Sequence, residues 1–353
     1  MLTSQMVKQY ASSHGIDGIA IGPTSRFEGA PRQMDPRFLF PEAKSFIMIL
    51  GRIPRGAYRG IEEGTNWPNY TFYGYYALNM IFNPSKVYDL CTFIEDHGHE
   101  ACPHYPGVPE AQPVPGTAPL REGAPPPQVT AQVRIAAAAA GLGQIGHHKN
   151  FMSKRFGPRV RLATILTDAE LDCDPIQEQD LCDHCMACVA ECPGSAIPPA
   201  KDGENIEITI EGRTISWGDV HMGKCALTHN GMNRKTNPFL HRDLPGLDLD
   251  VAKQDGMSQE EAHRLGYALL RHGRFRRTAE FPSDRISPYV SNTVHTWWYC
   301  ALCGAKGCIL ACLDHLEDKK KITCLFHNKR RKRPAWKLGG PRKVAPRSAE
   351  HLM

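Results

Sequence analysis

The chain has no apolar run that approaches the ~18 residues needed for a membrane-spanning helix. Its first ten residues contain neither the hydrophobic core of a signal peptide nor a twin-arginine pair. These absences favour a soluble protein in the reducing cytoplasm, where disulfides are rare. The 13 cysteines are therefore expected to bind metal rather than to pair with one another.

Acidic residues are missing from one long stretch near the C-terminus. From Lys319 to Arg347 there are 12 lysines and arginines and no aspartate or glutamate. The formal net charge of +5 thus hides a body with 30 basic and 37 acidic residues. Residues 319–353 are expected to form a basic tail. Such a tail is either solvated and partly disordered, or it contacts nucleic acid or an acidic electron donor.

Two groups of closely spaced cysteines stand out from the rest. The first comprises Cys182, Cys185, Cys188 and Cys192, followed directly by Pro193. The spacing C-x2-C-x2-C-x3-C-P is typical of bacterial ferredoxins, in which the fourth cysteine binds a second cluster. A zinc ribbon also uses C-x2-C pairs, but it explains neither the triplet nor the proline. The sequence therefore predicts an iron–sulfur protein.

The second group supplies the ligands that a second cluster requires. It consists of Cys300, Cys303, Cys308 and Cys312, with the spacing C-x2-C-x4-C-x3-C. It lacks the following proline, since Leu313 stands in that place.

The remaining pattern predicts an α/β (α+β) fold with a mixed sheet in the first half of the chain. Helices are expected at residues 2–14, 85–97 and 132–140, strands at 18–22, 45–50 and 161–167, a hairpin at 206–217, and a capped helix from Ser258 to about Arg271. The aromatic stretch 66–79 is expected to enter a helix, where it either packs in the core or lines a pocket for a flat cofactor. The proline-rich stretch 103–127 is expected to be a lid or a flexible segment.

Three segments that precede the first cysteine group resemble the corrinoid iron–sulfur reductases. They are Ala140-Gly-Leu-Gly143, Phe156-Gly-Pro-Arg-Val-Arg161 and Leu166-Thr-Asp168. This family includes epoxyqueuosine reductases and the catalytic subunits of reductive dehalogenases. The resemblance covers roughly residues 1–225 and 300–312. A dinucleotide-binding role for the glycines of 141–146 is disfavoured, because they follow a predicted helix and not a strand.

The resemblance implies two domains. Residues 1–170 would be a nitroreductase-like cobalamin-binding domain, and residues 171–318 a ferredoxin-like domain with two [4Fe-4S] clusters and an insertion at 226–299. A base-off cobalamin would receive electrons from reduced ferredoxin or flavodoxin and remove oxygen or halide from a small organic substrate. One alternative is an epoxyqueuosine reductase acting on tRNA, although the family's acidic proton donor is absent from Pro125-Pro-Pro-Gln128. Another is a two-cluster electron-transfer protein without corrinoid.

If the clusters are ligated as in two-cluster ferredoxins, cluster one takes Cys182, Cys185, Cys188 and Cys312. Cluster two would take Cys192, Cys303, Cys308 and either Cys300 or Cys225, because Cys225 matches the family's lone cysteine; the local spacing favours Cys300. The predicted catalytic residues are Tyr73, His147 and Arg161, with His148 beside them. The predicted cofactor-binding residues are Tyr76, Gly141, Leu142, Gly143, Gly146 and Arg159. The competing interpretations are core packing for the tyrosines, a helix C-cap for the glycines and surface ion pairs for the arginines.

Overall fold

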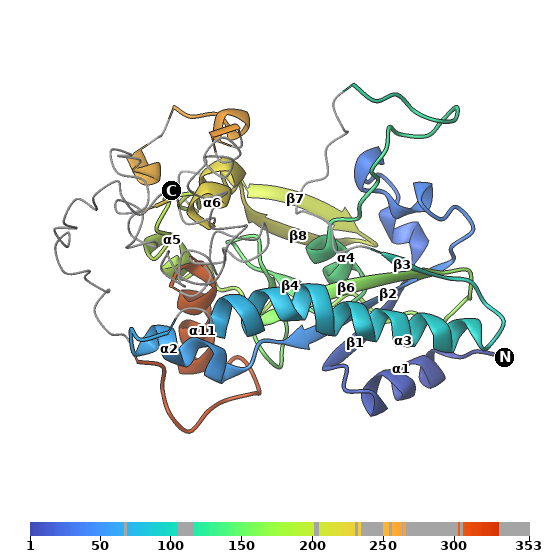
Figure 1. The fold of residues 1–353 in the computed structure, drawn as a ribbon, viewed down its shortest axis with the longest axis horizontal. Helices are drawn as coiled ribbons and strands as arrows, with labels where there is room; N and C mark the ends of the chain where they lie inside the picture. Colours follow the sequence, from blue (N-terminus) through green and yellow to red (C-terminus); the bar gives the residue numbers. More distant parts are fainter. Residues whose placement is uncertain are drawn as a thin grey trace, which may run out of the picture.

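The computed structural model describes most of the chain up to Arg331 (Figure 1). The described residues are 1–66, 69–104, 116–200, 205–229, 232–233, 250–253, 256–262, 264–265, 303 and 306–331. Within these ranges, no helix combines the length and apolar character that crossing a membrane requires. Cys300, most of the predicted insertion and most of the basic tail lie outside them.

A four-stranded sheet forms the centre of the first half of the chain. Its order is β1 (Gly18–Pro23), β2 (Ser45–Arg52), β6 (Val160–Thr167) and β3 (Ala101–His104). Each neighbouring pair is antiparallel, so the prediction of a mixed sheet is wrong for these strands. The connection from β1 to β2 contains only short 3-10 turns. It has no crossover helix of the kind that makes neighbouring strands parallel.

The two central strands are apolar on both faces, as expected for a sheet covered on both sides. In β2, Phe46 and Met48 point to one face and Ile47 and Ile49 to the other. The first face packs against α4 (Val133–Ala139). The second packs against α1 (Ser4–Ser13) and α3 (Asn83–Glu95), which run side by side below the sheet in Figure 1. The predicted helices and strands of this region are confirmed.

Local chemistry explains where two of these helices begin. The Thr3 side chain accepts a hydrogen bond from the Met6 amide at the start of α1, and Gln132 accepts one from the Arg134 amide at the start of α4. Both contacts satisfy amides that have no partner inside the helix. The alanines of α4 are buried, and their small side chains let this helix lie close to the sheet.

The aromatic stretch forms wide π-type turns, η5 (Tyr70–Tyr76) and η6 (Leu78–Phe82), which lead into α3. Tyr70 is buried, whereas Phe72 and Tyr73 are 40% and 50% exposed. Turns of this kind occur often at functional sites. The stretch therefore contributes both to the core and to the surface.

The second half of the chain carries both groups of closely spaced cysteines. Its described elements are α5 (Ala187–Ala190), the hairpin β7 (Asn205–Ile210) and β8 (Arg213–Gly218), α6 (Met222–His229) and α11 (Cys308–Asp318). Leucines of α11 pack against Ile53, Tyr58 and Tyr70 and so join it to the first half. The predicted hairpin is confirmed, and so is the capping box, in which Ser258 and Glu261 bond each other's amides. The predicted end of that helix lies outside the described residues.

Candidate iron–sulfur centre

Four cysteines from distant parts of the chain line one cavity. They are Cys182, Cys185 and Cys188 from the first cysteine run and Cys312 from α11. The cavity opens to solvent and is also lined by His147, His148, His184 and His315. Left-handed backbone at His184 and Met186 turns the loop tightly enough to bring its three thiols together.

A second set of cysteines lies next to the first. Burial raises the pKa of the Cys303 thiol, and the neighbouring thiols of Cys225, Cys308 and Cys192 raise it further. The same pattern holds for Cys308, whose pKa is raised by burial and then by Cys225 and Cys192. Cys225 on α6 is thus one of four neighbouring thiols. Cys300, the alternative eighth ligand, lies outside the described residues.

The chemistry of both sets suits a metal cluster. Burial and the neighbouring thiols Cys182 and Cys185 raise the pKa of Cys188 to about 12. Burial and the same run of cysteines raise the pKa of Cys312 well above its usual range. Four thiolates cannot stay ionised side by side in a half-buried site unless a cation compensates them. Iron would do so, and it would bind the deprotonated sulfurs directly.

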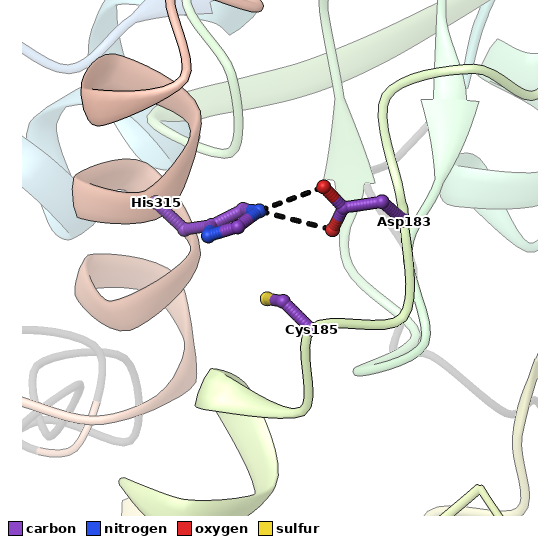
Figure 2. Close-up of side chains that lie close together, drawn as sticks. All are labelled: Asp183, Cys185 and His315. Carbon is purple, nitrogen blue, oxygen red and sulfur yellow. Dashed lines mark hydrogen bonds and ion pairs between the residues drawn. The ribbon is translucent and has the colours of Figure 1, made fainter.

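An ion-pair network forms part of the lining of the cavity at the first cysteine set. His315 Nε2 lies 2.8 and 3.0 Å from the two carboxylate oxygens of Asp183, and Lys321 Nζ lies 3.2 Å from the nearer of these oxygens. Figure 2 shows Cys185 directly beside this pair. Burial acts to raise the pKa of Asp183, but the bonds from His315 and Lys321 outweigh it and hold that pKa at about 2.

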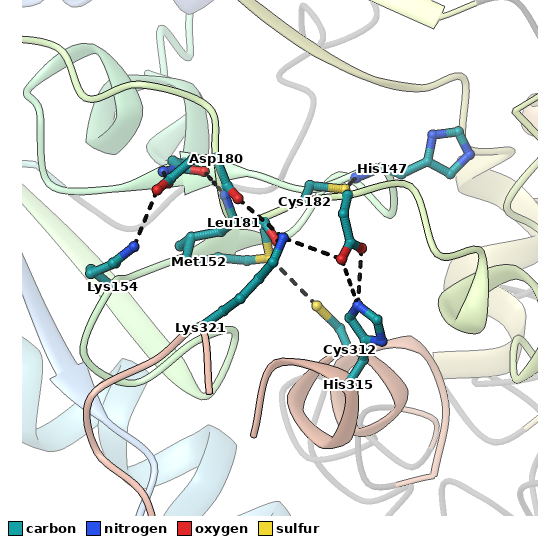
Figure 3. Close-up of polar contacts among 11 residues, drawn as sticks. His147, Met152, Lys154, Asp180, Leu181, Cys182, Cys312, His315 and Lys321 are labelled. Atoms are coloured by element: carbon teal, nitrogen blue, oxygen red, sulfur yellow. Dashed lines mark hydrogen bonds and ion pairs between the residues drawn. The ribbon is translucent and has the colours of Figure 1, made fainter. Parts of the chain in front are cut away.

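Further contacts fix the loop that carries Cys182 (Figure 3). The Gln144 side chain bonds both the Leu181 amide, at 2.8 Å, and the Asp180 carboxylate, at 2.6 Å. The His147 amide donates to Cys182 Sγ at 3.4 Å. Because Gln144 and His147 belong to the hairpin of β4 (Gln144–Ile145) and β5 (Phe151–Met152), this hairpin positions the loop.

A group of cationic and aromatic side chains lies beside the second set of cysteines. The Arg161 guanidinium lies 5.0 Å from the Tyr75 ring centroid and donates to the Tyr70 hydroxyl at 3.4 Å. The Tyr75 ring lies 5.2 Å from that of His229, which is 3.8 Å from Cys303 Sγ. Burial and, after it, the charges of Arg161 and Arg134 lower the pKa of His229 to about 4. The ring is therefore neutral near pH 7.

The structure separates the predicted catalytic residues. Arg161 lies beside the second cysteine set, whereas His147 lines the cavity at the first set. His147 Nε2 is 2.8 Å from the Pro198 carbonyl, so a neutral ring carries its proton on Nε2. Tyr73 is half exposed, and its ring contacts Phe72. Their catalytic roles stay predictions.

The predicted cofactor-binding residues have packing roles in the structure. Arg159 is buried, bonds the Ile53 carbonyl and Cys324 Sγ, and lies against two phenylalanine rings. Leu142 belongs to the core between the sheet and α4, and Tyr76 is half-buried beside Phe72. A Cβ on Gly143 would meet the Met152 carbonyl at 2.3 Å, and one on Gly146 would meet His148 at 3.0 Å. Their part in binding a cofactor stays a prediction.

Gly141 offers a direct test of the close packing around this turn. It has φ +84°, and a Cβ would lie 2.2 Å from the Pro175 carbonyl oxygen. We expect Gly141→Ala to lower the free energy of unfolding by about 3 kcal/mol, since the strained backbone and the backbone clash add together. Gly98 is the matched control: its φ is +82°, with nothing within 4 Å. Gly98→Ala should cost only ~1 kcal/mol. If urea unfolding shows that both variants lose the same unfolding free energy, the predicted clash at Gly141 is refuted.

Several site residues were missed from the sequence. Arg134 stands in an alanine-rich helix, and its isolated charge among apolar residues was an available signal. Tyr70, Tyr75 and His229 gave no signal that separates them from neighbouring aromatics. Asn150 follows the glycine turn, and no local sequence pattern predicts its contact with Cys308.

Comparison with known proteins relates the chain to two kinds of reductase. No family model matches it. It is 34% identical over 89 residues to the tetrachloroethene reductive dehalogenase of Dehalobacter restrictus. This matched stretch covers 23% of this chain and 16% of the relative. Over 82 residues it is 37% identical to the epoxyqueuosine reductase of Leadbetterella byssophila, covering 22% and 26% respectively. The chain therefore has homologues among both reductive dehalogenases and epoxyqueuosine reductases, as the sequence motifs predicted.

The matched stretches span at most about a quarter of the length of these two relatives. Among solved structures, the epoxyqueuosine reductase from Streptococcus thermophilus aligns with 82% of this chain and 88% of its own, at 14% identity and a TM-score of 0.38. The catabolic reductive dehalogenase NpRdhA in complex with 3-bromo-4-hydroxybenzoic acid aligns with 83% of this chain and 37% of its own, at 17% identity and a TM-score of 0.43. The relationship rests on the sequence matches.

Proposed function

We propose that the chain is an iron–sulfur oxidoreductase that uses bound cobalamin to remove oxygen or halide reductively from a small organic substrate. The observation that carries this proposal is that eight cysteine thiols lie in two adjacent sets of four. Helix α11 supplies one thiol to each set, Cys308 and Cys312, one turn apart. Such an arrangement suits two [4Fe-4S] clusters close enough to exchange electrons.

The eighth ligand in this proposal is Cys225 and not Cys300. Cys225 acts on the pKa of both Cys303 and Cys308, so its sulfur lies close to theirs. Cluster one then takes Cys182, Cys185, Cys188 and Cys312, and cluster two takes Cys192, Cys225, Cys303 and Cys308. This revises the preference that local spacing alone gave to Cys300.

The described residues also fit a flat corrinoid near the π-type turns. Phe72 and Tyr73, whose rings contact each other, leave an exposed aromatic surface there, which suits a broad apolar ring. Arg161 Nε is buried and has no hydrogen-bond partner among the described residues. It is therefore available to a bound acceptor, such as a cofactor amide or phosphate. When bound, cobalamin supplies the reducing chemistry at carbon, and the protein supplies position, electrons and a proton.

Two of the three predicted catalytic residues, Arg161 and Tyr73, have a task in this scheme. Arg161 holds an anionic group of the cofactor or of the leaving halide, since a guanidinium stays charged at any ordinary pH. Tyr73 is exposed beside the aromatic surface and donates a proton to the product. Electrons enter from reduced ferredoxin or flavodoxin.

A second candidate function follows from the matches to epoxyqueuosine reductases. In this alternative the substrate is a modified tRNA, and the basic residues 319–353 contact its phosphates. The segment Pro125-Pro-Pro-Gln128 has no carboxylate to act as the proton donor. Salt-sensitive tRNA retention that disappears when residues 332–353 are removed would favour this alternative.

Cobalamin titration tests the proposal. Anaerobically reconstituted protein should bind cobalamin, with a base-off visible spectrum. We expect Arg161→Met to weaken binding about tenfold, which corresponds to ~1.4 kcal/mol for one lost charged hydrogen bond.

Arg52→Met is the matched control, because Arg52 follows Gly51, the partner of Arg161 in the sheet, and points to the opposite face. It should bind cobalamin like the wild type. Protein with full iron content and no affinity for cobalamin would overturn the proposal and leave a two-cluster electron carrier.

A further inference from the structure

One turn of the chain touches both cysteine sets. It comprises residues 146–150, which connect β4 to β5. At one end, the His147 amide donates to Cys182 Sγ at 3.4 Å. At the other, Asn150 Nδ2 donates to Cys308 Sγ at 3.5 Å. Cys182 belongs to cluster one and Cys308 to cluster two, so the turn lies between the two proposed clusters.

The turn is held firmly in place. The Gly146 amide bonds the Asn150 carbonyl at 3.0 Å, which closes the turn. Arg134 Nη1 donates to the Lys149 carbonyl at 3.0 Å, and the Gly218 amide donates to the His147 carbonyl at 2.9 Å. Bonds from α4 and β8 therefore fix the turn from outside, and its donors meet the sulfurs in a defined geometry.

The orientation of the Asn150 amide follows from its partners. Its nitrogen lies 3.4 Å from the His148 carbonyl oxygen as well as 3.5 Å from Cys308 Sγ. Both partners accept hydrogen bonds, so the NH₂ group and not the carbonyl must point toward them. The Asn150 backbone amide also bonds His148 Nδ1 at 3.0 Å, which ties the residue to the turn.

We propose that Asn150 tunes the reduction potential of cluster two through its hydrogen bond to Cys308. A donor at a ligating sulfur stabilises the added electron and raises the potential of the cluster. Cluster one receives its corresponding bond from the His147 backbone amide, which every residue except proline also provides. Asn150 is thus a positioning and tuning residue specific to one cluster. The inference rests on the proposed function only in requiring that both clusters form.

Redox titration followed by EPR tests the role of Asn150. Asn150→Leu removes the donor at similar size, and Asn150→Asp keeps the shape but places a negative charge beside the sulfur. Both variants should shift the midpoint potential of cluster two to more negative values, Asp further than Leu. The potential of cluster one serves as the internal control and should not move. The Cys225→Ser protein identifies which signal belongs to which cluster.

The outcomes of this experiment separate the two proposals. Unchanged potentials in variants with full iron content would overturn the role of Asn150 alone, and so would equal shifts of both clusters. A wild-type protein that assembles no clusters would overturn the proposed function and this inference with it. If Asn150→Leu fails to fold, the isosteric Asn150→Asp still decides the question.

Discussion

Replacing Cys225 with serine is expected to reduce the iron content from about eight to about four atoms per chain. Cys225 lies on α6, and its thiol acts on the pKa of Cys303 and Cys308. Without this ligand, cluster two loses one of its four sulfurs and does not assemble stably. Cluster one draws its ligands from Cys312 and the first cysteine run, so it should remain.

Cys300→Ser is the matched control for this experiment, because Cys300 is the other candidate for the same ligand position. It should keep about eight irons and both EPR signals. The reverse result, with four irons in Cys300→Ser and eight in Cys225→Ser, would assign the ligand to Cys300. Cys173→Ser, at an exposed cysteine, controls for general effects of losing a thiol.

Glu62→Gln is expected to lower the free energy of unfolding by about 3–5 kcal/mol. Glu62 forms an ion pair with Arg55, and the two side chains are only 1% and 8% exposed. Arg59 also bonds Glu62, at 2.9 Å. The amide keeps the shape of the carboxylate but removes its charge, so the buried Arg55 guanidinium loses its ion-pair partner.

Urea unfolding of the metal-loaded protein, followed by circular dichroism without oxygen, measures this loss. Glu170→Gln is the control, because its pair with Lys44 is largely exposed and should contribute less than ~1 kcal/mol. The double variant Arg55→Met with Glu62→Leu should recover most of the loss, since it removes both charges of the buried pair. If the Glu62 variant is as stable as the Glu170 variant, the buried pair of Arg55 and Glu62 does not stabilise the fold as proposed.

The sequence predicted the parts of the fold that local patterns control. Strand β2 contains a continuous apolar run, β6 is mostly apolar, and α3 has apolar residues at helical spacing, so each was located within a few residues. Strand direction was not predicted correctly, because it depends on how connections cross the sheet. The π-type turns of η5 and η6 were also missed, since an aromatic-rich segment is compatible with several helix types.

The candidate site divides in the same way. Cysteine spacing is a local pattern, and it is sufficient by itself to predict an iron–sulfur protein. The choice between Cys225 and Cys300 depends on where α6 lies relative to α11, which spacing cannot show. The pairing of Arg161 with Tyr75, and of Asn150 with Cys308, likewise joins residues about 85 and 160 positions apart. Only tertiary structure brings them together.

Iron quantification with Mössbauer spectroscopy on anaerobically purified protein tests the central claim most directly. Two four-thiolate sets predict about eight irons per chain, all in [4Fe-4S] clusters. Protein that instead contains about one or two zinc ions in tetrahedral sulfur sites, and no iron, would contradict the account. In that case the cysteines would be structural, and the proposed reductase chemistry would have no route for its electrons.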